Sequence, residues 1–308
     1  MKEYVYYYYN MDVDTINNND NYYSFFHNGN LYYFVYFNRT IEELNDLINI
    51  NLELKNKGIN VHDIIMNKYN YPLSKIGELT YVLLKINGQK DELVDIFTIA
   101  NMNNKLVLNN KTSKLYRNNW GELWSKKIDY LENQISELGK NKLIILDSFG
   151  YYVGLAENAI SYVNRANEVY ANDYHKICLS HRRIFYPNTI LNYYNPLSFI
   201  FDLEERDVAE YLKYMFFYGD EAFQELCAYL KIATLNTYGY HMLYARLLYP
   251  SYYFDLFEEV MNNNKDENDL LKIIDKVNDY ELFLKNVYKE ISKYTNLDKI
   301  NWLIKKEL

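Results

Sequence analysis

The segment that decides the fold is Cys178-Leu179-Ser180-His181-Arg182-Arg183-Ile184-Phe185-Tyr186-Pro187-Asn188. Its apolar start is predicted to be a strand that ends in His181, and Asn188 follows seven residues later. A second apolar run, Ser198-Phe199-Ile200-Phe201, ends in Asp202. A histidine, an asparagine and an aspartate with this spacing around two short strands match the layout of a kinase-type phosphotransfer site.

Asn188 and Asp202 are the candidate metal ligands of this layout. Carboxylate and amide oxygens are the hard ligands that magnesium prefers, and in kinases such a pair holds the metal against nucleotide phosphates. A purely structural interpretation is also open. In that interpretation, Asn188 forms a turn after Pro187, and Asp202 caps a helix that begins near Glu205.

The residue two positions after His181 should be the aspartate that accepts the proton of the substrate hydroxyl, but Arg183 occupies it. Arginine cannot accept a proton at neutral pH, and loss of a general base typically costs about 10²–10⁴ in rate. A cation at this place would also compete with magnesium, and Arg183 could pair with Asp202 in place of a metal. His181 and Arg183 are therefore interpreted as degenerate catalytic-loop positions, and no catalytic residue is assigned.

Two other parts of a phosphotransfer site are missing from the sequence. No Gly-x-Gly-x-x-Gly motif occurs, and the first predicted hairpin offers only Gly29. The strand predicted over residues 31–37 contains no Lys or Arg, so the cation expected to meet the phosphates is absent. Glu42 and Glu43 in the helix that follows then have no obvious cationic partner, and nucleotide-binding residues cannot be assigned.

Composition narrows the class of protein. The chain of 308 residues suits two lobes, and its net charge of −8 without a large basic cluster argues against a nucleic-acid partner. No apolar run approaches the length of a membrane span, and the N-terminus lacks the features of a secretory signal, so a cytoplasmic protein is expected. The two cysteines, Cys178 and Cys227, are predicted to be buried and reduced.

Tyrosine is unusually frequent, with 36 residues. A surface for stacking or oxidative cross-linking would use such an excess. The alternative is AT-rich codon usage, which also enriches Asn, Lys and Ile, and which we favour.

The predicted architecture is α+β and bilobal. Residues 1–21 are expected to form a loose extension or edge strand. Residues 22–90 are predicted to form a small antiparallel N-lobe: strands over 22–27 and 31–37 flank the turn Asn28-Gly29, a capping box of Thr40 and Glu43 starts a helix, and strands follow over 61–67 and 79–86. A hinge is expected near residues 85–91.

Residues 91–308 are predicted to form a larger, mainly helical C-lobe. Apolar residues recur at three- and four-residue spacing from Trp120 to Leu138, with Gly139 as the stop, and a second helix is expected across 154–163. Short strands are expected around 177–180, 189–192 and 198–202, and helices follow one another from Glu205 onward.

Several segments of the chain, taken in their order, resemble the kinase-like proteins of bacterial spore coats and their relatives in low-GC Gram-positive bacteria. These proteins share the fold of aminoglycoside phosphotransferases and choline kinases. The segments are Trp124-Ser125-Lys126-Lys127-Ile128-Asp129-Tyr130-Leu131-Glu132, Tyr151-Tyr152-Val153-Gly154-Leu155-Ala156-Glu157-Asn158-Ala159, Leu179-Ser180-His181-Arg182-Arg183-Ile184, Arg206-Asp207-Val208-Ala209-Glu210-Tyr211, and Tyr244-Ala245-Arg246-Leu247-Leu248-Tyr249-Pro250-Ser251-Tyr252-Tyr253-Phe254-Asp255.

Active members of the wider fold carry His-Gly-Asp, an Asn five residues later and a second Asp after a strand. The resemblance thus places His181 on the loop histidine, Arg183 on the catalytic aspartate, and Asn188 and Asp202 on the metal ligands. It implies a pseudokinase that acts as a scaffold or interaction protein with a protein partner, associated with the spore coat. The alternative is an active phosphotransferase with a relocated base, which would use Mg-ATP to phosphorylate a small hydroxylated substrate. A cross-linking structural protein is the third interpretation.

Overall fold

The computed structural model describes residues 1–19, 22–88, 92–108, 113–138, 141–170, 173, 175–184 and 189–305. The chain forms two compact units. Unit 1 comprises Met1–Val94, Asn109–Tyr116 and Pro187–Ile200, and unit 2 comprises Asp95–Leu108, Arg117–Tyr186 and Phe201–Leu308. The predicted lobe boundary lay near residue 90, whereas unit 1 also takes in two later segments.

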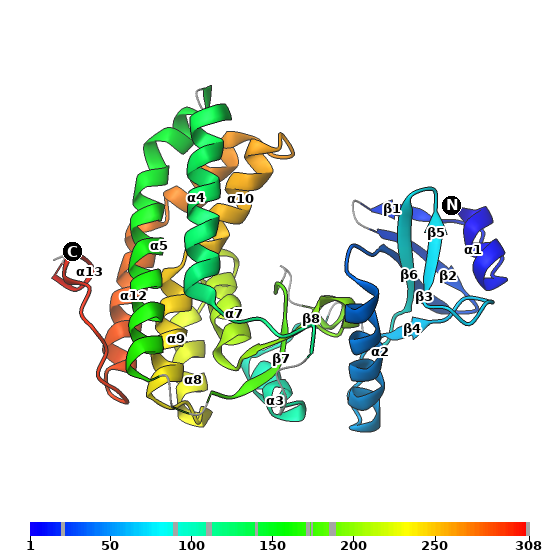
Figure 1. Ribbon diagram of the computed structural model, residues 1–308, viewed down its shortest axis with the longest axis horizontal. Helices are drawn as coiled ribbons and strands as arrows, with labels where there is room; N and C mark the ends of the chain where they lie inside the picture. Colours follow the sequence, from blue (N-terminus) through cyan, green and yellow to red (C-terminus); the bar gives the residue numbers. More distant parts are fainter. Residues whose placement is uncertain are drawn as a thin grey trace. The chain divides into compact units, whose positions relative to one another are not determined.

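Unit 1 is built on a six-stranded antiparallel sheet with the order β1-β2-β3-β6-β4, in which β5 also pairs with β6 (Figure 1). Its strands are β1 (Asn17–Asn19), β2 (Tyr22–His27), β3 (Asn30–Tyr36), β4 (Asp63–Ile65), β5 (Leu73–Ile76) and β6 (Leu79–Lys85). The predicted turn between β2 and β3 is confirmed, since Asn28 and Gly29 take positive φ values of 47° and 72°. Strand β5 was not predicted.

The N-terminal segment is more ordered than expected. Residues Lys2–Tyr9 form helix α1, and its Val5 is fully buried against the sheet residues Phe25 and Phe34. Strand β1 pairs with β2 at the sheet edge, as one of the two expectations for this segment stated. Residues 1–19 therefore contribute to the core of unit 1.

Helix α2 (Ile41–Asn56) begins with the predicted capping box. The Thr40 hydroxyl accepts a hydrogen bond from the Glu43 backbone N–H at 3.2 Å, and the Glu43 carboxylate accepts one from the Thr40 N–H at 3.4 Å. The strand predicted over 189–192 is wrong. Ile190–Tyr193 is a short helix, α6, because the Thr189 carbonyl accepts from the N–H groups three and four residues ahead. The 3₁₀ helix η2 (Pro196–Ser198) follows.

Unit 2 is mainly helical, as predicted. Its helices are α3 (Ile96–Lys105), α4 (Trp120–Leu138), α5 (Leu143–Val169), α7 (Glu205–Tyr218), α8 (Ala222–Ile232), α9 (Thr237–Leu248), α10 (Ser251–Met261), η3 (Glu267–Leu270), α11 (Leu271–Ile274), α12 (Val277–Ile291) and α13 (Asn301–Lys305). The predicted helix over 120–138 is confirmed, while the one expected over 154–163 is the middle of the much longer α5. Gly139 lies outside the described residues.

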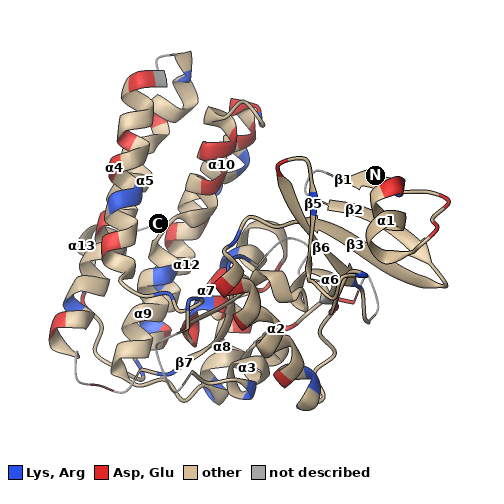
Figure 2. Ribbon diagram, turned by 45° about the vertical axis from the view of Figure 1, so that its right-hand side comes forward, with Lys and Arg blue, Asp and Glu red and all other residues tan. Residues whose placement is uncertain are grey.

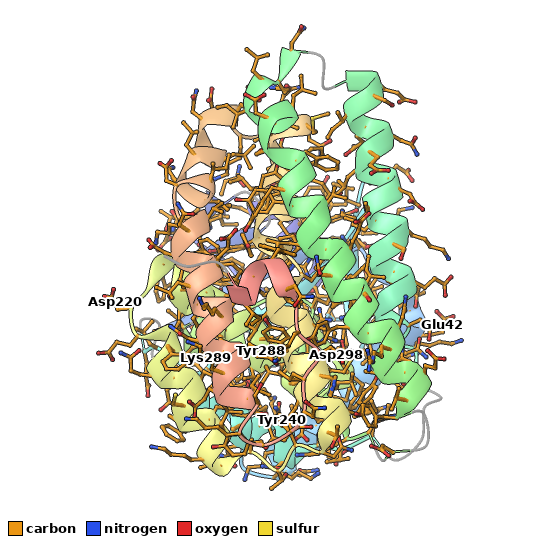
Figure 3. All side chains as sticks on the ribbon, turned by 90° about the vertical axis from the view of Figure 1, so that its left-hand side faces the viewer. Glu42, Asp220, Tyr240, Tyr288, Lys289 and Asp298 are labelled. Carbon is orange, nitrogen blue, oxygen red and sulfur yellow. The ribbon has the colours of Figure 1, made fainter. Side chains whose placement is uncertain are left out.

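The core of unit 2 lies between α5 and its neighbours α4 and α9, and side chains fill the space between the helices (Figure 3). Two short strands, β7 (Ile177–His181) and β8 (Phe199–Leu203), form a two-stranded sheet in which every residue is buried. Cys178 and Cys227 are free thiols as predicted, although Cys227 is only partly buried. No helix within the described ranges is both long and apolar enough to cross a membrane.

Candidate functional site

The ends of β7 and β8 bring together His181 and Asp202 on unit 2, where the sequence placed them. His181 is held by Asp207 in the first turn of α7: the Asp207 carboxylate accepts a hydrogen bond from the His181 backbone N–H at 3.0 Å and lies 2.6 Å from its Nδ1. Both side chains are about 1% exposed. This histidine is therefore a fixed part of the core.

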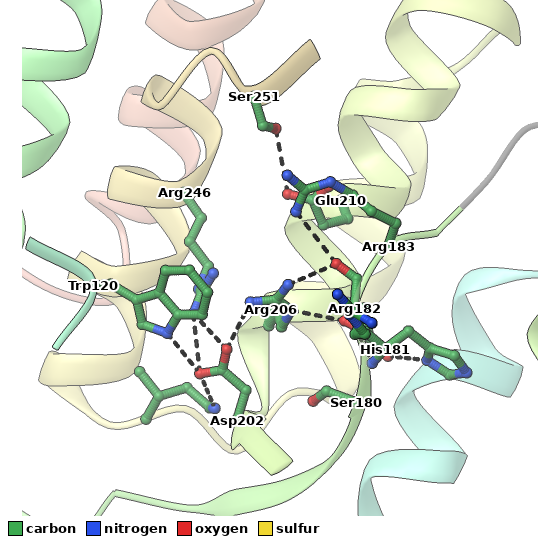
Figure 4. Close-up of polar contacts among 12 residues, drawn as sticks. Trp120, Ser180, His181, Arg182, Arg183, Asp202, Arg206, Glu210, Arg246 and Ser251 are labelled. Atoms are coloured by element: carbon green, nitrogen blue, oxygen red, sulfur yellow. Dashed lines mark hydrogen bonds and ion pairs between the residues drawn. The ribbon is translucent and has the colours of Figure 1, made fainter. Parts of the chain in front are cut away.

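Asp202 is fully buried and its carboxylate is surrounded by donors (Figure 4). Its Oδ2 accepts from Arg206 Nη1 at 2.8 Å and from Arg246 Nη2 at 3.2 Å. Its Oδ1 accepts from Arg246 Nη2 at 3.1 Å, from the Trp120 indole N–H at 3.0 Å and from the Leu203 backbone N–H at 2.8 Å. Asp202 does not cap α7, whose N-cap position is Glu204.

This donor set does not fit a magnesium ion. A metal ligand needs a free lone pair facing the ion, and both oxygens of Asp202 already face N–H donors and two guanidinium charges. A metal ion bound to Asp202 would displace Arg206 or Arg246 from the carboxylate. The displaced guanidinium would then be buried without its partner. Within the described ranges, no cluster of three or more His, Cys, Asp and Glu residues could hold a metal. The other candidate ligand, Asn188, lies outside the described residues.

Arg206 connects the two halves of the predicted site. Besides its ion pair with Asp202, its Nε donates to the His181 carbonyl and its Nη2 to the Arg182 carbonyl, each at 2.9 Å. One side chain therefore fixes the chain after β7 to the end of β8. In the folded protein, the carboxylate that would hold a metal instead orients this arginine.

Arg183, at the position of the catalytic base, does not pair with Asp202, so this alternative is not the one observed. It makes a two-pronged ion pair with Asp255 on α10, with Nε at 2.9 Å from Oδ2 and Nη2 at 3.0 Å from Oδ1. The two side chains are 40% and 45% exposed. Because Arg206 and Arg246 already surround Asp202, Arg183 has no place beside it.

A third polar group lies on the adjacent turns of α7 and at the start of α10. Lys213 Nζ donates to Glu210 Oε1 at 2.8 Å and to the Ser251 hydroxyl at 2.6 Å. Burial alone would raise the pKa of Glu210, but Lys213, Arg183 and Arg206 outweigh burial and lower that pKa to about 2. Glu210 is therefore ionised at neutral pH.

In unit 1, the strand expected to carry a phosphate-binding lysine has none: β3 contains no Lys or Arg. The nearby Arg39 pairs with Glu43 at 3.3 Å and donates to the carbonyls of Leu197 at 3.0 Å and Phe199 at 2.9 Å. The expectation that Glu43 lacked a cationic partner was therefore wrong. Arg39 is 4% exposed in its side chain and ties α2 to the segment at η2.

Sequence reasoning missed Trp120, Asp207, Arg246 and Asp255 as members of this cluster. Arg246 carried a signal, because it stands as a lone charge in the apolar run of α9, where a buried cation requires a partner. The identity of that partner, 44 residues earlier in the chain, could not be found from spacing.

Comparison with known proteins identifies the family of the chain. A family model described as "Spore coat putative kinase YutH" matches residues 2–287. The endospore coat-associated protein YutH of Bacillus subtilis (strain 168) is 28% identical over 210 residues, which cover 60% of this chain and 61% of that protein. The match therefore spans about three fifths of the relative.

Solved structures show the same fold at low identity. An aminoglycoside phosphotransferase from Alicyclobacillus acidocaldarius superposes with a TM-score of 0.67 at 12% identity, covering 92% of this chain and 94% of that one. The AMP-bound spectinomycin phosphotransferase APH(9)-Ia gives 0.58 at 13% identity, with 96% and 98% coverage. The predicted α+β fold of the aminoglycoside phosphotransferase type, with an antiparallel N-terminal sheet and a helical C-terminal region, is confirmed.

Proposed function

The chain belongs to the spore coat kinase family of the YutH type, and we propose that it is a catalytically impaired member that acts as a scaffold or interaction protein of the spore coat. The observation that carries this proposal is the closed state of Asp202, whose two oxygens are taken up by Arg206, Arg246, Trp120 and a backbone N–H. Arg183 at the base position and the absence of a lysine on β3 support the same conclusion.

These three features remove different parts of the reaction. Phosphoryl transfer requires a cation for the phosphates, metal ligands and a group that orients the nucleophile. An arginine at the base position cannot take the proton. A closed carboxylate cannot bind the metal without breaking two buried ion pairs, which costs several kcal/mol. Together, these three features should lower the rate of transfer more than the loss of the base alone would.

The test is a transfer assay with Mg-ATP labelled in the γ-phosphate and a panel of small amino-sugar and amino-alcohol acceptors. We expect no labelled product above the protein-free background, and no shift in the unfolding temperature with Mg-ATP. The Asp202→Ala variant controls for contaminating kinases, because a contaminant's activity survives that change. Turnover that the wild type shows and the variant lacks would establish the alternative, an active ATP- and magnesium-dependent phosphotransferase.

The proposed scaffold role can be tested separately from catalysis. Spores of a sporulating strain that lacks the protein should show an altered set of extractable coat proteins, and complementation with the wild-type chain should restore it. Complementation by the Arg183→Lys variant is expected to work equally well, since lysine keeps the positive charge that pairs with Asp255. An unchanged coat in the deletion strain contradicts the scaffold role.

A further inference from the structure

Unit 2 contains a cavity of about 270 Å³ next to the Asp202 cluster, lined by residues of α4, α7, α9 and α10. Five cationic side chains line it: Lys127, Arg183, Arg206, Lys213 and Arg246. Only Glu210 and Asp255 represent the acidic residues in the same lining. Basic and acidic residues both lie along α7, as Figure 2 shows. The wall is thus richer in positive than in negative groups.

The positive excess persists when the acids behind the wall are counted. Asp202 neutralises part of the charge of Arg206 and Arg246, and Glu258 pairs with Lys127. The five cations of the lining therefore still exceed these two acids and the two acids of the lining by one positive charge. The low pKa of Glu210, described above, has the same cause. An anion in the cavity would offset the repulsion among cations that lie close together.

One donor behind the wall is unsatisfied. Arg246 is 3% exposed, and its Nε is buried without a hydrogen-bond partner. A buried donor without an acceptor costs roughly 1–3 kcal/mol, but this nitrogen is closed to solvent and is not a contact for a ligand in the cavity. Arg246 also stacks with Arg206 against Trp120, and each guanidinium carbon lies 4.7 Å from the ring. The guanidinium groups are therefore held in fixed orientations.

The remaining walls are flat and aromatic. Trp124 stacks on Tyr249 with ring centroids 4.3 Å apart and an angle of 9° between the planes. The Ser251 hydroxyl, which accepts from Lys213, adds a neutral polar group to the lining. The volume lies below the roughly 300–1,000 Å³ of sites for drug-sized ligands, which limits the occupant to a small molecule.

We propose that this cavity binds a small oxyanion, a phosphate or the phosphate of a small monoester, with Lys127 and Arg183 as the cations at its accessible side. These two side chains are 31% and 40% exposed, whereas those of Arg206, Lys213 and Arg246 are at most 5% exposed. Guanidinium groups match the oxygens of phosphate in geometry and charge. The proposal is independent of the proposed function, because binding an oxyanion requires neither metal nor transfer.

The chain offers a matched pair of variants. Lys126 and Lys127 are neighbours on α4, but Lys127 lines the cavity while Lys126 is 68% exposed and pairs with Glu122 on the same helix. Lys127→Gln and Lys126→Gln therefore change the net charge of the protein equally and differ in which face they alter. Arg183→Gln removes the second accessible cation. All three change side chains that are at least partly exposed, so the variants are expected to fold.

The experiment titrates the full chain with inorganic phosphate, phenyl phosphate, acetate and chloride at constant ionic strength, and follows tryptophan fluorescence and the unfolding temperature. We expect saturable binding of both phosphates, a weaker response to acetate and none to chloride. Lys127→Gln and Arg183→Gln should each raise the dissociation constant about tenfold, the loss of one charge-assisted contact. Lys126→Gln should leave it unchanged.

Three outcomes would overturn the proposal: a phosphate response no larger than that of chloride, equal weakening by Lys126→Gln and Lys127→Gln, or acetate as effective as phosphate. A parallel titration with Mg-ATP separates this site from a nucleotide cleft. Phosphate binding without Mg-ATP binding supports both proposals, whereas Mg-ATP binding with turnover refutes the proposed function and leaves the phosphate result to be judged by its own variants.

Discussion

Replacing Asp202 by alanine should destabilise unit 2 far more than the loss of a metal ligand would. In the wild type, its carboxylate is 0% exposed and balances Arg206 and Arg246, each with a side chain about 4% exposed. The substitution leaves two buried guanidinium groups without a counter-ion. Removing one partner of a buried ion pair costs about 3–5 kcal/mol, and we expect a loss of about 4 kcal/mol in the free energy of unfolding.

The matched control is Asp255→Ala. Asp255 also pairs with an arginine, Arg183, but their side chains are 45% and 40% exposed. Exposed pairs contribute about 0–1 kcal/mol, so this variant should lose less than about 1 kcal/mol. The two substitutions remove the same chemical group and differ mainly in the burial of the pair.

Urea unfolding followed by tryptophan fluorescence reports on the correct unit, because Trp120, Trp124 and Trp302 all lie in unit 2. In thermal unfolding, 4 kcal/mol corresponds to a decrease of about 8–16 °C for a domain of 150–250 residues. If Asp202→Ala loses no more stability than Asp255→Ala, the ion pairs of Asp202 with Arg206 and Arg246 do not stabilise unit 2 as proposed. A gain in stability would indicate an open carboxylate waiting for a cation.

Three further predictions concern single groups. Burial raises the pKa of Glu205 to about 8, so the folded state retains a proton that the unfolded chain releases near pH 4.5. Stability should then fall as the pH rises from about 4.5 to 8, by up to ~1.4 kcal/mol per pH unit, and Glu205→Gln should abolish that slope in urea titrations; an unchanged slope contradicts the assignment. Glu210 has the opposite sign: its pKa near 2 gives stability that is present above about pH 4.5 and lost toward pH 2, and acid titration of Glu210→Gln should lack this loss. Thr40→Ala removes the capping box of α2 and should cost about 1 kcal/mol, seen as roughly fivefold faster amide exchange in α2 and no change in α4.

Local signals in the sequence predicted the local structure well. The Thr40 and Glu43 capping box, the Asn28-Gly29 turn and the apolar spacing of α4 each depend on residues within a few positions of one another. Helix α1 was missed because consecutive tyrosines carry no helical periodicity, and only Val5 is buried. The wrong strand over residues 189–192 contains only the apolar pair Ile190-Leu191, which is too short for periodicity to distinguish helix from strand.

The candidate site was predicted in part. Spacing located His181 and Asp202 at the ends of two buried strands, because that layout is a property of neighbouring elements. It did not reveal which cation meets which carboxylate. Asp202 pairs with an arginine 44 residues away, and Arg183 with an aspartate 72 residues away. Such pairings depend on how α7, α9 and α10 pack, which no local pattern records.

The ion pairs of Asp202 give this aspartate a structural role in unit 2 that does not depend on any reaction. Arg206 binds Asp202 and also donates to the carbonyls of His181 and Arg182, so one side chain holds the ends of β7 and β8 together. A change at Asp202 therefore affects the chain after β7 even when no substrate is present. Loss of this buried carboxylate would leave the charges of Arg206 and Arg246 uncompensated. An aspartate at this position is consequently no evidence for metal-dependent transfer; the test is whether its oxygens are free, and here they are not.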